Sequence, residues 1–151
     1  MTNFDEGNMK DLYERLSTKK IKVTEVAKWG PYFRNQWENH FVNHLSLQEK
    51  KEIYLYDDDG ACGYLWHVFS FEKRECLSEE EAERAFNKQL KNKCFVFYQH
   101  LDDVLIIKKA REFEFSDLED ESDVYVVDSD FKWTYVKTHE TGLCGPYFYK
   151  K

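Results

Sequence analysis

Residues 124–137 read VYVVDSDFKWTYVK, and this stretch decides the fold. The apolar, mostly β-branched run at 124–127 favours a strand. The polar residues at 128–130 are typical of a turn. After the turn, Phe131, Trp133 and Tyr135 alternate with Lys132 and Thr134, which predicts a half-exposed strand. Two strands separated by so short a turn indicate an antiparallel hairpin.

Further strands are predicted on both sides of this hairpin. Residues 94–100 and 64–71 are almost entirely apolar, which favours strands in the middle of a sheet, with Phe97 and Trp66 in the core. Residues 21–26 alternate weakly and indicate an edge strand, and residues 147–149 indicate a last one. The apolar run within 103–109 is too short to assign by its period.

Helices are expected between these strands. Met9, Leu12, Tyr13 and Leu16 form one apolar stripe and predict a helix over 7–17. A helix over 30–44 would place Phe33, Trp37 and Phe41 on one face, with a proline in its first turn. Two capping boxes, which begin at residues 46 and 78, predict helices that end near 52 and 92. The pattern as a whole predicts an α+β fold in which a mostly antiparallel sheet of about five or six strands packs against three or four helices.

Length and composition indicate one globular domain over residues 1–151, with residues 1–6 disordered. The 151 residues include 12 Phe, 10 Tyr and 4 Trp and carry a net charge of −7. The charge disfavours nucleic acid as a partner, and no apolar run is long enough to span a membrane. The N-terminus is too polar for a signal peptide. We therefore expect a cytoplasmic protein, a monomer or weak dimer, in which Cys62, Cys76, Cys94 and Cys144 are free thiols.

The negative charge is concentrated in residues 112–130, which contain nine Asp and Glu and no Lys or Arg. One interpretation is a solvated acidic loop. The other is a surface for a basic partner protein, because clustered charge accelerates association with the opposite charge. The stretch lacks the glycine that a calcium-binding EF-hand loop requires. The predicted binding residues are the acids and the neighbouring rings, namely Glu119, Asp120, Glu121, Asp123, Tyr125, Trp133 and Tyr135.

Catalytic and metal-binding candidates are few, and no cofactor is expected. No nucleotide-binding loop or nucleophile elbow occurs. Acid–base chemistry would use imidazoles close to a carboxylate, and the candidates are His67, His100, His139 and Glu140. A tetrahedral zinc site could combine Cys62 and His67 with His139 and Cys144. A spacing of five residues places such a pair on opposite faces of a straight strand, so we predict no metal.

Several segments resemble one family. They are KWG at 28–30, CGYLWHVFS at 62–70, FYQH at 97–100, WTYV at 133–136, THET at 138–141 and GPYF at 145–148. The chain is similar over roughly residues 20–148 to an uncharacterised bacterial family, the domain of unknown function four-two-seven-five. This resemblance implies a small cytosolic bacterial protein with an α+β fold. It supplies no catalytic residues.

The sequence therefore favours a non-enzymatic, acidic protein-binding domain. Aromatic residues anchor protein interfaces, and clustered charge selects the partner. An immunity or antitoxin-like inhibitor of a basic toxin has this profile, and so does an accessory protein from a mobile element. The alternative is a small, metal-dependent enzyme that uses His67, His100, His139 and Glu140.

Overall fold

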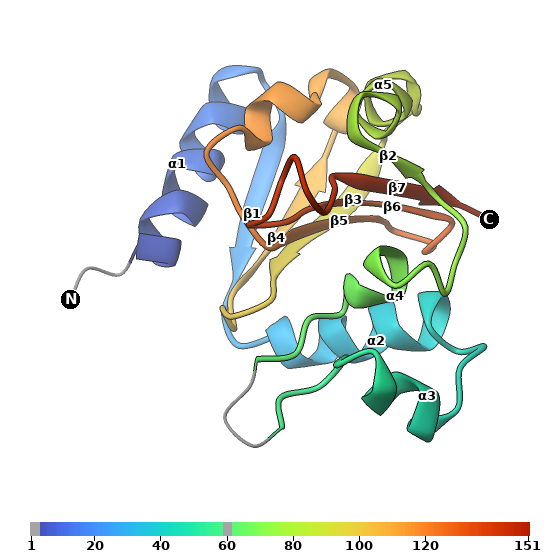
Figure 1. The fold of residues 1–151 in the computed structure, drawn as a ribbon. Coiled ribbons are helices and arrows are strands. Elements are labelled where there is room, and N and C mark those ends of the chain that lie inside the picture. Colours follow the sequence, from blue (N-terminus) through green and yellow to red (C-terminus); the bar gives the residue numbers. More distant parts are fainter. Residues whose placement is uncertain (1–3, 59–61) are drawn as a thin grey trace.

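The computed structural model describes residues 4–58 and 62–151, which form an α+β fold around one antiparallel sheet (Figure 1). The helices are α1 (Phe4–Thr18), α2 (Gly30–Phe41), α3 (Leu47–Glu52), α4 (His67–Ser70), α5 (Glu79–Lys88) and the 3-10 turns η1 (Ala110–Glu112) and η2 (Phe115–Leu118). The strands are β1 (Lys22–Val26), β2 (Leu77–Ser78), β3 (Lys93–Tyr98), β4 (Val104–Lys108), β5 (Val124–Asp128), β6 (Trp133–Lys137) and β7 (Tyr147–Lys150). Residues 1–3 of the predicted disordered stretch lie outside the described residues, and α1 begins at Phe4.

The seven strands follow the order β1-β4-β3-β5-β6-β7-β2, and every neighbouring pair is antiparallel. The predicted hairpin is the β5–β6 pair, in which Val124 lies opposite Lys137 and Val127 opposite Thr134. The strand at 21–26 is confirmed as an edge strand, and the ambiguous run at 103–109 forms β4 beside it. The fold class is as predicted, with one strand more than the upper expectation.

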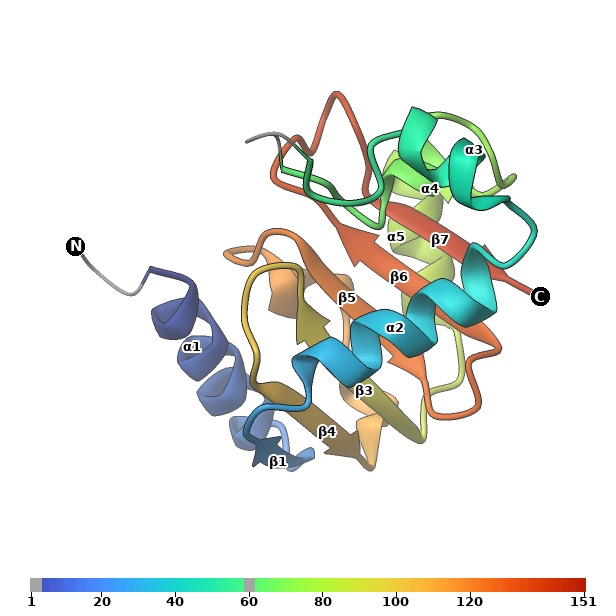
Figure 2. The same ribbon diagram turned by 90° about the horizontal axis from the view of Figure 1, so that it is seen from below.

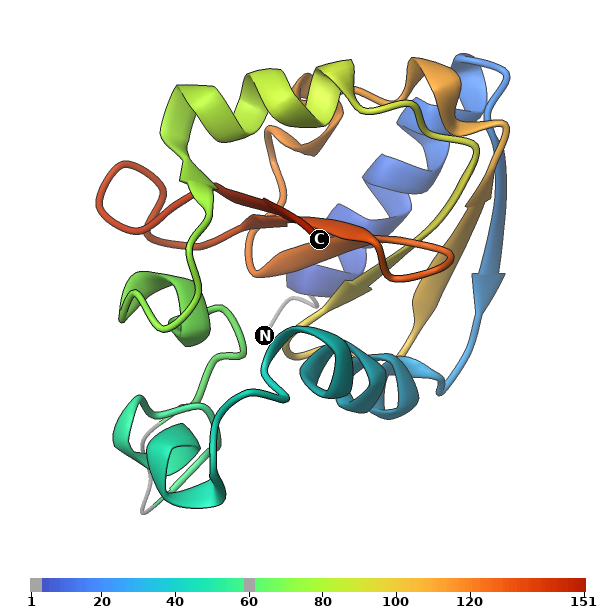
Figure 3. The same cartoon turned by 90° about the vertical axis from the view of Figure 1, so that its right-hand side faces the viewer.

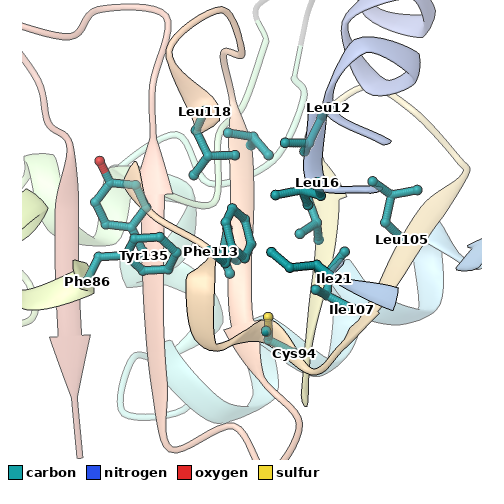
Figure 4. Close-up of a cluster of buried hydrophobic side chains, with 14 of the residues drawn as sticks. Leu12, Leu16, Ile21, Phe86, Cys94, Leu105, Ile107, Phe113, Leu118 and Tyr135 are labelled. Atoms are coloured by element: carbon teal, nitrogen blue, oxygen red, sulfur yellow. The ribbon is translucent and has the colours of Figure 1, made fainter. Parts of the chain in front are cut away.

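Helices cover both faces of the sheet, so the described residues form two hydrophobic cores. One face carries α1, α5 and the 3-10 turns, and the other carries α2, α3 and α4 (Figures 1 and 3). The first core joins Leu12 and Leu16 of α1 to Phe86 of α5, whose ring stacks on Tyr135 at 4.6 Å (Figure 4). The second core lies under α2, which crosses the strands in Figure 2, and includes Trp37. Two-sided coverage removes most of the sheet from water and stabilises it through apolar burial.

The helices largely agree with their sequence patterns. Met9, Leu12 and Leu16 are buried, whereas Tyr13 remains exposed. Phe33, Trp37 and Phe41 form the buried face of α2, which ends three residues earlier than expected. The capping box of α3 is present, with Glu49 N donating to Ser46 Oγ at 3.1 Å and Ser46 N donating to Glu49 Oε1 at 2.9 Å. Ser78 precedes α5 without a side-chain cap, and α5 ends at Lys88 rather than near residue 92.

The predicted central strand at 64–71 is wrong. These residues form a turn followed by α4, in which Ser70 N donates to Trp66 O at 3.2 Å and Phe71 N donates to His67 O at 2.9 Å. The segment packs on the sheet instead of joining it. Trp66 is nevertheless in the core as expected, with only 1 % of its surface exposed. Burial of an aromatic side chain is therefore achieved here without strand pairing.

The predicted half-exposed character of residues 131–137 is also wrong, because helices cover both sides of β6. Trp133 and Tyr135 face the first core, and Val136 faces the second. Thr134 is fully buried, accepts a hydrogen bond from Trp37 Nε1 at 2.9 Å and donates to Val126 O at 2.8 Å. Phe131 precedes the strand and has a left-handed backbone conformation, with φ of 57°. Its side chain packs against the second core. Its ring therefore does not share a face with Trp133 and Tyr135.

Candidate functional site

Most of the binding residues predicted from the sequence are buried in the structure. Of the seven predicted binding residues, only Glu119 and Asp120 are exposed. The other five are buried, namely Glu121, Asp123, Tyr125, Trp133 and Tyr135. The stretch wraps through η2 into the central strand β5, which brings its side chains under the helices. Tertiary packing therefore buries three of the nine acids of the stretch, Asp117, Glu121 and Asp123.

Basic side chains from α1, the turn after it and β6 bind the acidic stretch. Lys19 Nζ lies 2.9 Å from the buried carboxylate of Asp117, and the Arg15 guanidinium donates to Asp117 O. Lys137 Nζ donates to Glu119 O at 2.7 Å and to Glu121 O at 2.9 Å. The buried part of the stretch is thus held by basic side chains of the same chain.

The imidazole candidates meet around one tyrosine. Tyr64 lies in the turn before α4, and its ring centroid is 5.5 Å from that of His67, 5.5 Å from that of His100 and 5.1 Å from that of His139. These residues come from α4, from the turn after β3 and from the turn after β6. The structure therefore brings together the three histidines that the sequence analysis named as acid–base candidates. No pattern in the sequence indicated that Tyr64 would lie at their centre.

Asp123 joins this group to the core. Its Oδ1 accepts hydrogen bonds from Trp66 Nε1 at 3.0 Å and from His139 N at 3.2 Å. His139 Nδ1 lies 3.0 and 3.1 Å from the two carboxylate oxygens, so this nitrogen carries a proton and donates it to Asp123. The other ring nitrogen, Nε2, lies 3.4 Å from Glu140 Oε2. A carboxylate that accepts several N–H groups fixes their orientation, so Asp123 holds both rings in place.

A second set of hydrogen bonds holds the Tyr64 turn on the sheet. Gln99 Oε1 accepts from Leu65 N at 3.1 Å and from the Tyr125 hydroxyl, which in turn accepts from Trp66 N at 3.1 Å. The preceding chain passes so close to Tyr56 that a Cβ on Gly63 would lie 2.2 Å from its carbonyl carbon. Glycine at this position therefore permits the close approach that positions the turn.

The hydroxyl of Tyr64 is in an anionic environment. Its pKa is raised, first by burial and then by the negative charges of Asp123, Cys62, Glu140 and Asp57. Trp66 stacks on the Tyr64 ring with a centroid distance of 5.1 Å. Rings attract cations through their electron-rich faces, and nearby carboxylates add to that attraction. The surroundings of Tyr64 therefore favour a positively charged group.

The rings continue from Tyr64 across an exposed face. His67 donates from Nδ1 to Tyr54 O at 2.8 Å, and its ring lies 5.4 Å from Phe71. The Phe71 ring lies 6.1 Å from that of Tyr54. Tyr54 is 58 % exposed and Phe71 44 % exposed. We call the whole set the Tyr64 surface, which consists of Tyr54, Tyr64, His67, Phe71, His100 and His139.

A polar pocket of about 330 Å³ adjoins this surface at His100. Its lining includes Glu38, which accepts hydrogen bonds from Lys50 Nζ at 2.9 Å and from the Tyr56 hydroxyl. Arg34 also lines the pocket, but its guanidinium donates to Tyr98 O at 3.0 Å, Leu101 O at 2.7 Å and Asp102 Oδ1 at 3.1 Å. Asp57 provides a further carboxylate on the wall. Glu38 and Arg34 are thus paired with Lys50 and Asp102, which lie outside the lining of the pocket.

The described residues contain no group of three or more His, Cys, Asp or Glu side chains placed to hold a metal ion. Of the zinc candidates, Cys62 is an exposed free thiol, and the two ring nitrogens of His139 face Asp123 and Glu140. Cys144 is half-buried, and both burial and the neighbouring Glu140 raise its thiol pKa. All four cysteines are free thiols in the structure. No helix in the described part of the chain is both long and apolar enough to cross a membrane.

Comparison with known proteins identifies a family without a known activity. No curated protein and no solved structure matches this chain significantly. The sequence model of one family, described as "Domain of unknown function (DUF4275)", matches residues 9–148. That range includes both cores, the Tyr64 surface and the polar pocket beside it. Since the match extends over nearly the whole chain, the protein belongs to the family of the domain of unknown function DUF4275.

Proposed function

We propose that this chain is a non-enzymatic protein-binding domain whose Tyr64 surface receives Lys or Arg side chains of a basic partner. The observation that carries the proposal is the Tyr64 ring itself, half-buried among three imidazoles and surrounded by the negative charges of Asp57, Asp123 and Glu140. Tyrosine is enriched at interface hot spots. Exposed Tyr54 and Phe71 extend the same surface with apolar area.

The net charge of the whole molecule also favours a basic partner. The chain carries a net charge of −7, so long-range attraction accelerates encounter with a positive protein. Complementary charge chiefly affects the association rate, whereas a buried ring chiefly affects dissociation. An immunity or antitoxin-like inhibitor of a basic toxin would combine these two properties. We place this role in the cytoplasm, where free thiols such as the four in this chain persist.

A second candidate function is acid–base catalysis at His139. It is favoured by the hydrogen bonds from His139 Nδ1 to Asp123, which orient the ring as catalytic carboxylates orient imidazoles. Against it, Nε2 of the same ring faces Glu140 at 3.4 Å. A catalytic imidazole needs one nitrogen that can reach a substrate. The binding proposal therefore accounts for the geometry better.

The proposal is tested with a basic 12-residue peptide of alternating Lys, Arg and Gly, and with an acidic peptide of equal length as its control. Imidazole resonances are followed by NMR during the titration. We expect saturable shifts at His67, His100 and His139, with His40 and His44 unaffected. Binding should weaken as salt rises, because exposed charges are screened.

Matched variants locate the binding site. Tyr64→Ala should weaken peptide binding at least about fivefold, the usual effect of losing an interface anchor worth more than about 1 kcal/mol. Glu119→Gln combined with Asp120→Asn removes two exposed charges and should change the affinity less than about twofold. Shifts confined to the neighbourhood of Glu119 and Asp120, or equal effects of both variants, would contradict the proposal.

A further inference from the structure

A second cluster, of basic side chains, lies on the same side of the sheet as α2. It combines His40 at the end of α2, His44 after it, Arg74 before β2 and Lys151 after β7. Lys151 Nζ donates to His40 Nδ1 at 3.2 Å, and Arg74 Nη2 donates to His44 Nδ1 at 2.8 Å. His44 Nε2 donates in turn to Lys73 O at 2.6 Å. We call these four residues the Arg74 cluster.

Aromatic rings and backbone atoms hold the cluster in position. The Arg74 guanidinium lies 4.9 Å from the Tyr149 ring centroid, donates to Tyr149 Oη at 2.8 Å and donates to Phe41 O at 2.7 Å. Lys151 Nζ lies 5.2 Å from the Phe41 ring centroid. The His40 ring stacks on Phe131 at 4.4 Å. Such contacts restrict the rotamers of side chains that are otherwise mobile, so less entropy is lost when they bind a ligand.

Glu72 and Glu75 line a pocket together with Arg74, but no ion pair within the described residues neutralises the cluster. Neither Arg74 nor Lys151 forms an ion pair with any carboxylate within residues 4–58 and 62–151. Burial and then Arg74 lower the pKa of Lys151, and burial and then Lys151 lower the pKa of His40. Glu49 interacts electrostatically with His44 and Lys73, but its carboxylate accepts the capping hydrogen bond from Ser46. Two cations held close together without a counter-ion favour the binding of an anion.

We propose that the Arg74 cluster binds a phosphate dianion, either free or as the terminal group of a phosphomonoester. Two permanent cations match the charge of the dianion. A guanidinium has five N–H donors, of which three have partners here, and a lysine ammonium has three, of which one is used. The imidazoles of His40 and His44 accept from these cations in the free protein. A bound anion favours the protonated form of the His40 imidazole, which then becomes a donor itself.

The test titrates the full chain with inorganic phosphate while chloride keeps the ionic strength constant. NMR of the imidazoles reports the pKa of His40 and of His44. We expect phosphate to raise the pKa of His40 saturably, because a bound dianion stabilises the imidazolium form. Chloride alone should not do so. A pKa of His40 that does not respond to phosphate at millimolar concentrations would overturn the proposal.

Charge-matched variants separate a built site from general attraction. Lys151→Gln should weaken phosphate binding about tenfold, the effect of one charge-assisted hydrogen bond worth about 1.4 kcal/mol. Lys88→Gln removes an exposed charge on the opposite side of the sheet and should leave the affinity within about twofold. Equal weakening by both variants would overturn the site. Methyl phosphate distinguishes the two possible sources of the ligand. An affinity equal to that of inorganic phosphate indicates a phosphomonoester, and a much weaker affinity indicates free phosphate.

Discussion

Two buried carboxylates, Glu121 and Asp123, lie two residues apart and have opposite environments. Asp123 accepts N–H groups from Trp66 and His139, including both a ring and a backbone donor. Glu121 is 1 % exposed, and its Oε1 accepts from the Tyr98 hydroxyl. Its Oε2 has no hydrogen-bond partner among the described residues. Burial raises the pKa of Glu121 to about 7, although the hydrogen bond from Tyr98 opposes that shift.

The difference shows that burial alone does not determine what a carboxylate does. A buried charge is tolerated where donors replace water, and it is costly where they do not. Asp123 therefore organises the Tyr64 surface as an anion. Glu121 fits its site better as a neutral acid, because only one of its oxygens is satisfied by a donor. Substitution of each residue should reveal these opposite roles.

The largest effect is expected from Asp123→Ala. The variant leaves the buried Trp66 Nε1–H and the His139 N–H groups without their acceptor. The free energy of unfolding should fall by about 3 kcal/mol, within the range for breaking a buried paired charge. Urea unfolding followed by tryptophan fluorescence measures it. A loss below about 1 kcal/mol would show that Asp123 does not anchor this region.

Glu121→Gln should have a smaller effect that depends on pH. The carboxyl titrates near 4.5 when unfolded and at about 7 when folded, so the native state holds the extra proton between these values. The contribution of Glu121 to the free energy of unfolding is therefore full below about pH 4.5, declines up to about pH 7 and is lost above it. The variant should match the wild type near pH 4 and exceed it by about 2–3 kcal/mol at pH 8. Parallel stability curves of the two proteins between pH 4 and pH 8 would refute this assignment.

The smallest effect is expected from Glu119→Gln, which removes an equal charge from an exposed position in the same stretch. Surface substitutions without partners usually change the free energy of unfolding by less than about 0.5 kcal/mol. The variant should therefore retain the pH dependence of the wild type. If it instead flattened the stability curve, the dependence would arise from the summed charge of the stretch and not from Glu121.

Much of the fold could be predicted from local patterns, and the main error has a physical cause. Residues 64–71 are so apolar that composition alone favours a strand. Their buried positions are Leu65, Trp66, Val68 and Phe69, which is the spacing of a helical turn and not of a strand. His67 and Ser70 are the two less buried positions in that pattern. The spacing of these buried positions could therefore have predicted α4. The aromatic residues at both ends of the segment obscured that spacing.

The candidate site could be predicted only in part. The three histidines are recognisable as titratable groups, but their convergence depends on how α4 and the turns after β3 and β6 pack. Counting the charges along residues 112–130 also predicted that Glu121 and Asp123 are exposed, because such a count assumes that clustered acids remain in contact with water. Their burial follows from the position of β5 in the middle of the sheet. Such partners, distant in sequence, are invisible to any local pattern.

The order of the strands also affects the synthesis of this protein. Within the described residues, edge strand β1 pairs only with β4. Residues 22–26 therefore leave the ribosome before residues 104–108 are synthesised. In that interval the nascent strand exposes unpaired backbone groups that could pair with another chain. Lys22 and Glu25 are exposed on β1 in the finished fold. Charges at such positions discourage pairing between nascent chains, so the same two side chains protect the segment until its partner strand emerges.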